Sequence, residues 1–388
     1  MTPSTHSYAI LGAGRQGTAA AFDLVTFGGA GSVTLADADV AAAEKAASRV
    51  NELAGRDVAD STAVDASDES ALRAFLEPAD AAVSAVPYGL NLGVTRAAIA
   101  AGTHVCDLGG NTAIVRQQLD LDDAASAAGV CVVPDCGEAP GLATNLVAYA
   151  ISLVDGATDV VLYDGGLPQR PVPPWSYELT FSVDGLTNEY DGATTWVREG
   201  RPVEVDCLDP AEYELVDLGE PYGTLEAFPG NTSSTMPWTL GLRSLRSMIL
   251  RYPGHAAQFR AFRDLGLFER EPVDVRGVPV APRDLYHALL DPRVRAPEGV
   301  RDVVLARVIV TAPGAEAVVG LEVLPDDHGF NAMERSTGGH AAIVARMMAG
   351  GRVRPGATPV ELAVDPAEMV AEGRRRGFRI TEEVRPRA

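Results

Sequence analysis

The sequence predicts an α/β protein with a doubly wound parallel sheet at its N-terminal end and a second, α+β domain after it. Two observations carry this prediction. Over the first 135 residues, short apolar strands alternate with alanine-rich helical stretches, as in a parallel sheet covered by helices on both faces. Beyond Pro140 the strands are longer and alternate polar with apolar residues, which is typical of a mixed sheet with one open face.

The elements of the first part follow from this rhythm. Strands are expected at Tyr8–Leu11, Ser32–Leu35, just before Asp65, and at Ala81–Val86, His104–Leu108 and Val130–Val133. Helices are expected at Thr18–Phe27, Val40–Leu53, Ser70–Leu76, Leu92–Ala101 and Ala113–Ala128. Each strand is therefore followed by a helix, which is the connection that parallel strands require.

The second part has a different pattern. Strands are expected at Asp159–Tyr163, Glu178–Val183, Arg301–Thr311 and Glu316–Leu324. Helices are expected at Asn145–Leu153, Leu240–Leu250 and His340–Ala349, and a strand with a helix within Pro359–Arg376. A mixed sheet with few covering helices follows from this order.

Composition excludes several classes of function. The 388 residues carry 53 acidic and 32 basic side chains, which gives a net charge of −21. Nucleic acids and anionic membrane surfaces attract basic faces, so neither is expected as a partner. Lys45 is the single lysine and lies in a polar helical stretch, which argues against catalysis by a lysine.

The cysteines and the N-terminus indicate the compartment. The four cysteines have neither zinc spacing nor a secreted disulfide pattern, so no metal site is expected. The N-terminus lacks a basic leader, and no apolar run reaches ~18 residues. A soluble, cytoplasmic protein is therefore expected.

A glycine-rich turn, Gly12-x-Gly14-x-x-Gly17, stands between the first strand and the first helix. Gly12 permits a tight turn, Gly14 lets the backbone approach a pyrophosphate, and Gly17 lets the helix pack closely on the strand. Asp37 follows the second strand, where it is able to accept hydrogen bonds from ribose hydroxyls and to repel a 2′-phosphate. NAD is therefore expected in preference to NADP, although Arg15 keeps NADP open because its side chain is able to reach a phosphate.

Further motifs follow in an order that is more specific than any one of them. They are Ser84-Ala85-Val86-Pro87-Tyr88, Asp107-Leu108-Gly109-Gly110-Asn111-Thr112, Val133-Pro134-Asp135-Cys136-Gly137-Glu138-Ala139-Pro140-Gly141, Gly165-Gly166-Leu167-Pro168 and Leu250-Arg251-Tyr252-Pro253-Gly254-His255. With the glycine-rich turn, they resemble the saccharopine dehydrogenase-like oxidoreductases, and within them the lysine 6-dehydrogenases. The resemblance implies NAD(P)-linked oxidation of a carbon that bears an amine, and a homodimer.

The resemblance also implies the domain organisation. It places a Rossmann domain at residues 1–140, completed by residues 331–388 through a C-terminal helix that returns to it. Residues 141–330 then form an α+β domain for substrate binding and dimerisation. Around the sheet edge, the expected cofactor contacts beyond the three glycines and Asp37 are Arg15, Gln16, Asp65, Ala85, Val86, Pro87 and Asn111.

Two carboxylates follow the strand that ends at Val133. Asp135 and Glu138 lie at the carboxyl edge of the sheet, where open α/β folds bind ligands. Either one is able to hold a substrate ammonium and take its proton, or both belong to a solvated loop or a helix cap. Glu138 departs from the apolar residue usual in lysine-dehydrogenase-like sequences, and Ala139 departs from the aspartate of saccharopine reductases.

The other candidates lie on the remaining motifs. Arg251 is expected to hold a substrate carboxylate by bidentate hydrogen bonds, with a surface ion pair as the alternative. His255 is either a general base or a packed histidine, and Tyr88 either covers the nicotinamide or forms part of the wall. Gly165, Gly166 and Tyr252 are expected to line the substrate site. Asp135, Glu138, Tyr88 and His255 are the catalytic candidates.

The expected function is the NAD-dependent oxidation of lysine or a similar cationic amino acid to an imine or semialdehyde. Within the same class, the alternative is a saccharopine-type enzyme that acts on a larger secondary amine, which more cationic anchors in the pocket would favour. Outside it, the alternative is a dinucleotide-binding sensor without turnover.

Overall fold

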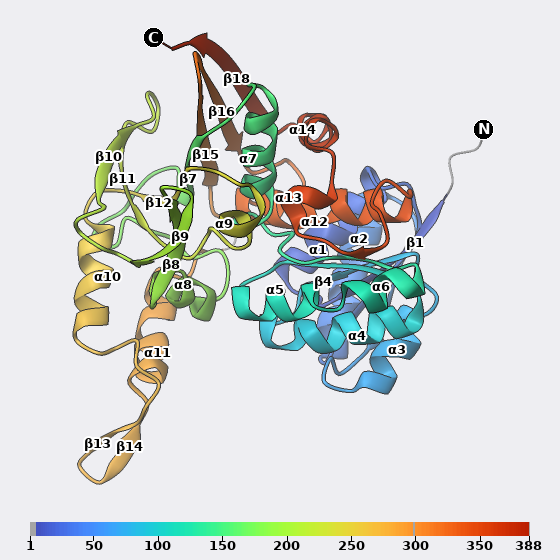
Figure 1. Ribbon diagram of the computed structural model, residues 1–388. Helices are drawn as coiled ribbons and strands as arrows, with labels where there is room; N and C mark the ends of the chain where they lie inside the picture. The colour runs from blue at the N-terminus through green and yellow to red at the C-terminus, as the bar shows by residue number, and fades with distance from the viewer. Residues whose placement is uncertain (1–4, 298, 388) are drawn as a thin grey trace. The chain divides into compact units, whose positions relative to one another are not determined.

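The computed structural model describes residues 5–297 and 299–387, which divide into two compact units (Figure 1). Unit 1 takes the chain up to Leu153, together with the segments Ser234–Thr239 and Glu334–Ile380. Unit 2 takes Val154–Ser233, Leu240–Met333 and the segment from Thr381 onward. The segment Glu334–Ile380 therefore returns to the N-terminal unit, whereas the residues after it belong to unit 2.

Unit 1 is built on a seven-stranded sheet of order β17-β6-β5-β4-β1-β2-β3, with every described pair parallel. Its strands are β1 (His6–Leu11), β2 (Ala30–Asp37), β3 (Ala59–Ala63), β4 (Ala81–Ser84), β5 (His104–Asp107), β6 (Cys131–Val133) and β17 (Gly356–Ala357). The strand order reverses between β1 and β4, and ligands of doubly wound folds bind at that point, outside the carboxyl ends of the strands.

Helices cover both faces of this sheet, with α1, α2 and α12 on one face and α3 to α6 on the other (Figure 1). The helices of unit 1 are α1 (Arg15–Thr26), α2 (Val40–Ala54), α3 (Glu69–Leu76), η1 (Tyr88–Leu90), α4 (Asn91–Ala101), α5 (Thr112–Leu119), α6 (Asp122–Ala128), α7 (Leu142–Ser152), α9 (Met236–Thr239), α12 (Ala332–Ala349), α13 (Val360–Ala363) and α14 (Pro366–Arg375). The predicted helix Ala113–Ala128 is thus two helices, interrupted at Asp120 and Leu121.

Local sequence explains where several of these helices begin and end. The Asp39 and Asp68 carboxylates accept N–H hydrogen bonds at the starts of α2 and α3. Gly55, Gly102 and Gly129 close α2, α4 and α6 in the left-handed conformation, which glycine adopts without strain. These caps fix helix lengths, and therefore the position of each loop at the carboxyl edge.

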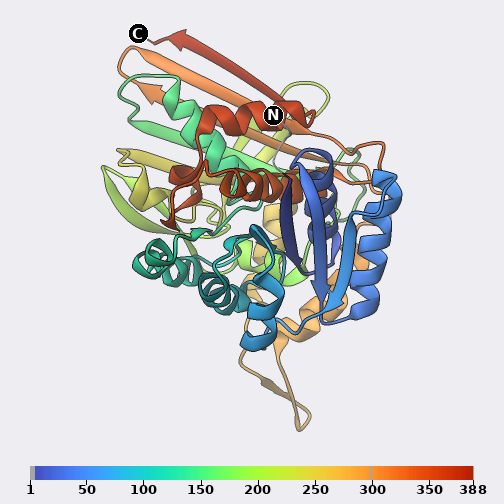
Figure 2. The ribbon, with the colours of Figure 1, turned by 90° about the vertical axis from the view of Figure 1, so that its right-hand side faces the viewer.

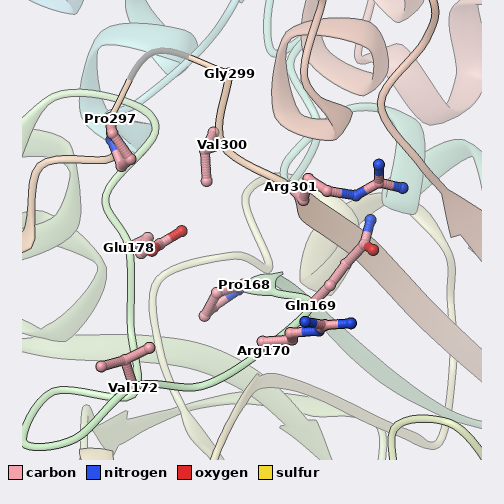
Figure 3. Close-up of a pocket in the computed structure, with 9 residues that line it drawn as sticks. All are labelled: Pro168, Gln169, Arg170, Val172, Glu178, Pro297, Gly299, Val300 and Arg301. Carbon is pink, nitrogen blue, oxygen red and sulfur yellow. The ribbon is translucent and has the colours of Figure 1, made fainter.

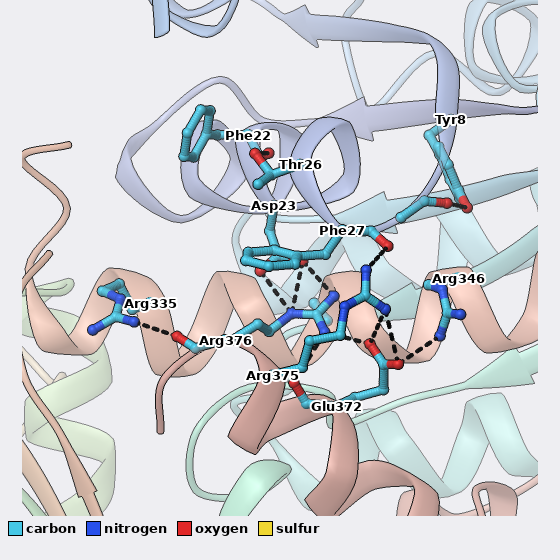
Figure 4. Close-up of polar contacts among 12 residues, drawn as sticks. Tyr8, Phe22, Asp23, Thr26, Phe27, Arg335, Arg346, Glu372, Arg375 and Arg376 are labelled. Atoms are coloured by element: carbon cyan, nitrogen blue, oxygen red, sulfur yellow. Dashed lines mark hydrogen bonds and ion pairs between the residues drawn. The ribbon is translucent and has the colours of Figure 1, made fainter. Parts of the chain in front are cut away.

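A buried ion network fixes α14 within unit 1 (Figure 4). The guanidinium of Arg376 lies 2.7 Å from Asp23 of α1 and 2.6 Å from Glu372 of α14. Glu372 also pairs with Arg346 of α12 at 3.1 Å. Burial raises the pKa of Asp23 and Arg376 opposes it, so the pair depends on Arg376 as its counter-charge. The network joins three helices that are far apart in the sequence.

Unit 2 contains a nine-stranded mixed sheet. Its strands are β7 (Asp159–Pro168), β8 (Ala193–Arg198), β9 (Arg201–Asp206), β10 (Glu214–Asp217), β11 (Thr224–Pro229), β12 (Ser244–Arg251), β15 (Asp302–Ala312), β16 (Ala315–Val323) and β18 (Arg379–Pro386). Along the main path the order is β10-β11-β12-β7-β15-β16-β18, and β8 joins β12 to β9. The β7–β12 pair is parallel and β7–β15 is antiparallel.

Helices and a small hairpin complete unit 2. The helices are α8 (Val183–Tyr190), α10 (His255–Asp264) and α11 (Pro282–Val294), and β13 (Val273–Val275) pairs with β14 (Val278–Val280). An aromatic core that includes Tyr190, Phe228 and Phe259 packs against β12. Figures 1 and 2 show that the β13–β14 hairpin extends away from α10 and α11.

Two predicted elements of unit 2 are wrong. Leu240–Leu250, expected as a helix, forms β12, because pairing with β7 and β11 on its two sides overrides its leucine-rich helical pattern. Glu178–Val183, expected as a strand, contributes a single bridge between Leu179 and Arg295, and α8 begins at its last residue.

Candidate active site

The glycine-rich turn follows β1 directly and contacts the loop after β4. Gly12 has a φ of +97°, and a Cβ there would stand 2.6 Å from the carbonyl oxygen of Ala85. A Cβ on Gly17 would collide with the carbonyl oxygen of Gly12, so α1 packs tightly on its own turn. At Gly14, in contrast, no described atom beyond the glycine and its two chain neighbours lies within 4 Å of the Cβ position. The turn is therefore closed on its inner side and open where a phosphate would approach.

The first turn of α1 provides the charge that favours an anion. Gly14 is the N-cap and has no side chain to cap the helix, and the first turn contains no acidic residue. Arg15 and Gln16 are the first two residues of α1. The guanidinium of Arg15 lies 3.7 Å from Glu334 of α12, and its side chain is 42% exposed. Free N–H groups, the helix dipole and an exposed arginine are consistent with phosphate binding.

The two predicted ribose-side carboxylates are held by their own loops. Both oxygens of Asp37 accept backbone N–H groups, from Ala13 at 2.9 Å and from Asp39 at 3.0 Å. Asp65 lies after β3 and is exposed, and the side chain and backbone of Ser67 donate to it. These hydrogen bonds lower the pKa of Asp65. Asp37 thus fixes the glycine-rich turn.

The loops after β4 and β5 lie next to each other at the same edge. Ala85, Val86 and Pro87 follow β4, and Tyr88 opens the short helix η1. A Cβ on Gly110 would stand 3.2 Å from the ring of Tyr88, so the ring covers the loop after β5. In that loop, the side chain of Asn111 caps α5 by accepting the N–H groups of Ala113 and Ile114.

Asp107 and Asp135 form a buried carboxylate pair at the ends of β5 and β6. One oxygen of Asp107 accepts the N–H of Asp135 at 3.2 Å and of Gly109 at 2.7 Å. The other accepts the side-chain amide of Gln118 at 2.6 Å. Burial raises the pKa of Asp135 to about 8, and the negative charge of Asp107 adds to this effect. Asp135 is therefore suited to exchange a proton near neutral pH.

The segment Ser234–Thr239 brings hydroxyl groups to two buried carboxylates, those of Asp135 and Glu361. The hydroxyl of Ser234 donates to Asp135, and those of Thr235 and Thr239 donate to Glu361 of α13 at 2.7 and 2.5 Å. Both carboxylates are buried, and Asp135 adopts a φ of +62° that non-glycine residues rarely adopt. The sequence analysis missed Ser234 and Glu361, because nothing local in the chain marks either residue as part of the site.

A buried histidine holds the loop between β6 and α7. His340 of α12 lies with Nδ1 3.0 Å from the carbonyl oxygen of Cys136 and Nε2 2.8 Å from Asn145. Burial lowers the pKa of His340 to about 4, so it is neutral at physiological pH. Glu138 is buried in this loop, and its carbonyl oxygen accepts the N–H of Ala143 in the first turn of α7. The loop that carries Asp135 and Glu138 is therefore rigidly supported.

In unit 2, Arg251 ends β12 in a buried cluster. Its Nε donates to the hydroxyl of Tyr190 at 2.9 Å, and its two terminal nitrogens donate to the Leu250 carbonyl oxygen at 2.9 Å and to Glu189 at 3.0 Å. The ring of Tyr177 lies 5.1 Å from the guanidinium carbon. The alternative of a surface ion pair does not apply, because the Arg251 side chain is only 4% exposed.

The other predicted substrate residues lie beside Arg251 on β7 and β12. A Cβ on Gly165 would stand 3.0 Å from a terminal nitrogen of Arg251, and one on Gly166 would stand 2.6 Å from Met333. The hydroxyl of Tyr252 donates to the Pro168 carbonyl oxygen at 3.0 Å. The structure thus brings Arg251, Tyr252 and the two glycines together.

His255 begins α10 within the aromatic core. Its Nε2 lies 2.9 Å from the hydroxyl of Tyr190, and its ring stacks on Phe259 at 4.1 Å. Burial, with the charge of Arg251, holds its pKa well below the usual range. These surroundings favour the packed alternative over a general base.

A surface hollow of about 600 Å³ lies beyond the end of β7 (Figure 3). Pro168, Arg170, Glu178 and Arg301 are among its lining residues. The side chain of Gln169 donates to the Asp302 carbonyl oxygen, which holds the two arms of the hollow together. The lining of the hollow therefore carries two arginines and one glutamate.

Two kinds of site are absent from the residues that the structure describes. No helix among them is long and apolar enough to cross a membrane. Across the same residues, no three histidine, cysteine or acidic side chains are grouped as metal ligands.

Comparisons with known proteins agree with this architecture. Among curated proteins, the chain is similar to a saccharopine dehydrogenase [NADP(+), L-glutamate-forming] of Schizosaccharomyces pombe, 26% identical over 53% of this chain and 47% of that protein. It is also 26% identical to a mitochondrial alpha-aminoadipic semialdehyde synthase of Rattus norvegicus, over 52% of this chain and 23% of that one. The chain therefore spans about half or less of the matched relatives' length.

Solved structures share the fold. Apo saccharopine dehydrogenase (L-Glu forming) from Saccharomyces cerevisiae superposes with a TM-score of 0.76 at 18% identity, over 98% of this chain and 100% of that one. A homospermidine synthase from Legionella pneumophila gives 0.63 at 12% identity, over 98% and 91%. The doubly wound sheet with a second mixed-sheet unit is confirmed.

The prediction of NAD is wrong. Residues 8–133 match the family model described as the saccharopine dehydrogenase NADP binding domain, and the fission yeast relative is named as an NADP(+) enzyme. The structure supplies a physical reason for the error. The prediction took the Asp37 carboxylate to accept the ribose hydroxyls, whereas both of its oxygens already accept backbone N–H groups.

The second family match covers most of the rest of the chain. Residues 137–376 match the saccharopine dehydrogenase C-terminal domain, which is more than half of the 388 residues. Together with the first match, it extends from the first strand of the parallel sheet to the ion network around α14. The chain belongs to the saccharopine dehydrogenase family.

Proposed function

We propose that this protein is an NADP-dependent dehydrogenase that oxidises an amine-bearing carbon of an amino-acid substrate. The observation that carries the proposal is the buried Asp135, which lies at the carboxyl edge of the same sheet as the glycine-rich turn. Its pKa of about 8 lets it take a proton from an ammonium group near neutral pH. An amine must lose that proton before its carbon is able to give up a hydride.

The residues at the glycine-rich turn of unit 1 are suited to bind the phosphates of the cofactor. Gly12, Gly14 and Gly17 with the first turn of α1 would hold the pyrophosphate, and Arg15 is the candidate for the 2′-phosphate. NADP, when bound, accepts the hydride. Tyr88 lies over the loop after β5, where it would shield the reacting carbon from water.

Each remaining side chain has one proposed role. Asp135 holds the proton at a carboxylate oxygen, with Ser234 as its hydrogen-bond donor. Glu138, which is buried in the same loop, is the candidate to pair with a cationic group of the substrate. Arg251 is the candidate that orients the substrate carboxylate by donating to it, in addition to its hydrogen bonds with Tyr190, the Leu250 carbonyl oxygen and Glu189.

Two amino-acid substrates are candidates. A lysine-type substrate fits the carboxylates near Asp135, and its product would be an imine or semialdehyde. A saccharopine-type secondary amine carries additional carboxylates and needs more counter-charges. Arg170 and Arg301 at the hollow beyond β7 favour this second candidate, as do the activities in the names of the relatives.

A turnover assay tests the function. Purified protein is mixed with NADP+ and either L-lysine, L-saccharopine, or a panel of other amino acids and polyamines, and NADPH absorbance is followed. NADPH formation with an amino acid is the expected result. Tight NADP+ binding without turnover of any amine would instead favour the dinucleotide-binding sensor.

The homodimer also remains a proposal. The β13–β14 hairpin exposes Val273, Val275 and Val278 by 51%, 49% and 58%. A second copy that covered these valines would remove their apolar surface from water. Light scattering should therefore report a dimer that weakens when the three valines are replaced by serine.

A further inference from the structure

The cluster around Arg251 holds one more carboxylate than the arginine neutralises. The carboxylates of Asp164 and Glu189 both interact electrostatically with the guanidinium of Arg251. The side chains of Asp164 and Arg251 are buried, and that of Glu189 is 22% exposed. One oxygen of Asp164 has no hydrogen-bond partner among the described residues. Such an atom is costly in a folded protein unless water or a ligand satisfies it.

The sheet places Asp164 and Arg251 on one face. Asp164 pairs in register with Ile249, and Arg251 follows Ile249 by two residues, so the three side chains point to the same side of β7 and β12. Gly166 shares this face, two residues beyond Asp164, and the side chain of Met333 lies directly against it. The Glu189 side chain is 22% exposed, so the cluster reaches solvent through it.

We propose that Asp164 binds the ammonium group of the substrate while Arg251 binds the adjacent carboxylate, so that the enzyme selects substrates with an intact α-amino acid end. The inference rests on the proposed function for the reaction itself, which takes place at a different amine. Asp164 supplies the acceptor that an ammonium needs, and Arg251 supplies the donors that a carboxylate needs.

The net charge of the cluster, alone and with a bound zwitterion, agrees with this assignment. Burial raises the pKa of Asp164 and of Glu189 to about 7 each, with their mutual repulsion adding to the effect on Asp164. One proton shared by the two carboxylates makes the cluster neutral. A bound zwitterion is also neutral, so it adds an ammonium and a carboxylate without leaving a buried charge unpaired.

The test uses Asp164→Asn, which keeps the size of the side chain and removes its charge. The matched control is Asp159→Asn on the same strand, whose carboxylate pairs with the exposed Arg243. Binding of L-lysine and L-saccharopine is measured by calorimetry, together with their counterparts that lack the α-amino group. NADP+ turnover of the same compounds is measured in parallel.

Asp164→Asn should weaken the α-amino compounds by ~10- to 100-fold, since a charged hydrogen bond is lost, and leave the desamino compounds unchanged. Its Tm should equal or exceed that of the wild type, because a poorly satisfied buried carboxylate has been removed. An equal effect on both sets of compounds, or failure of the wild type to bind the α-amino compounds, overturns the proposal. Selective binding without any turnover would overturn the proposed function and leave the assignment of Asp164 intact.

Discussion

The hydroxyl of Ser234 donates a hydrogen bond to the carboxylate of Asp135, although 99 residues separate the two in the chain. Ser234 begins a six-residue segment that belongs to unit 1 while the residues on either side of it belong to unit 2. The bond therefore makes the proton affinity of Asp135 depend on a distant part of the sequence.

Ser234→Ala should raise the pKa of Asp135, because the hydrogen bond from Ser234 favours the ionised carboxylate. If Asp135 is the base, the acidic limb of the pH profile of kcat/KM should move to higher pH. The control Thr158→Val removes a hydroxyl that donates to Asp159 on β7 and should leave the profile in place. A lower kcat/KM with an unmoved limb would contradict the role of Asp135 as the base.

Asp135→Asn should change how stability depends on pH. The pKa of Asp135 is raised in the folded state, so its stabilising contribution is fully present below the unfolded pKa near 4 and is lost as pH rises through about 8. The variant should therefore lose less stability than the wild type between pH 5 and pH 9, by an amount of up to ~1.4 kcal/mol per pH unit. Urea unfolding at several pH values measures this, with the exposed Asp57→Asn as control.

Arg251→Ala should destabilise unit 2 by ~3–5 kcal/mol, since Glu189 and Asp164 lose their counter-charge inside the protein. Such a loss by itself does not report on substrate binding. The double variant Arg251→Gln with Glu189→Gln removes both charges of the pair and should recover much of the stability. If Arg251 holds a substrate carboxylate, the double variant still shows a raised KM for amino acids and an unchanged KM for decarboxylated amines.

Glu138→Leu separates a substrate role from a structural one. If Glu138 faces the substrate, the variant should lower kcat/KM for lysine-like dications by ~10- to 100-fold, as expected for a lost charged hydrogen bond. NADP+ affinity should stay unchanged, because the glycine-rich turn is a different loop. A lower Tm with unaltered substrate preference would instead show that Glu138 only supports the start of α7.

Arg15→Gln should weaken NADP+ binding by about tenfold or more, because a charge-assisted hydrogen bond to phosphate is worth ~1.5–3 kcal/mol. NAD+, which lacks the 2′-phosphate, is the matched ligand control and should bind the variant and the wild type equally. Fluorescence titration with both dinucleotides measures the difference. Equal losses for the two ligands would move the role of Arg15 from the 2′-phosphate to the shared pyrophosphate.

The sequence predicted six of the seven strands of the unit 1 sheet, most of them short apolar runs followed by a helix, but not β17, which consists only of Gly356 and Ala357. β12 was not predictable in the same way, since its leucines and arginines fit a helix until β7 and β11 pair with it. The carboxyl edge could be inferred for Asp135 from strand polarity. Ser234 and Glu361 could not, because contacts over such separations leave no local periodicity.

The cofactor error has a similar origin. A carboxylate at the end of β2 has the expected position for ribose recognition. The spacing of the motif gives this position but not the hydrogen bonds that the carboxylate forms. Which hydrogen bonds the carboxylate already accepts is set by the conformation of the loop, here by the N–H groups of Ala13 and Asp39. Asp164 shows the opposite case. Nothing in the sequence marks it, and only the folded chain shows that one of its carboxylate oxygens has no hydrogen-bond partner among the described residues.

The place of β17 in the sheet has a consequence for synthesis on the ribosome. β6 gains its outer neighbour only when Gly356 and Ala357 have been made, and the thiol of Cys131 is paired with the carbonyl of Val353, 222 residues later. At ~5–20 residues per second, the nascent sheet keeps an open strand edge for roughly ten to forty seconds. An open edge recruits other strands, so a chaperone that shields β6 during this interval should raise the yield of folded protein.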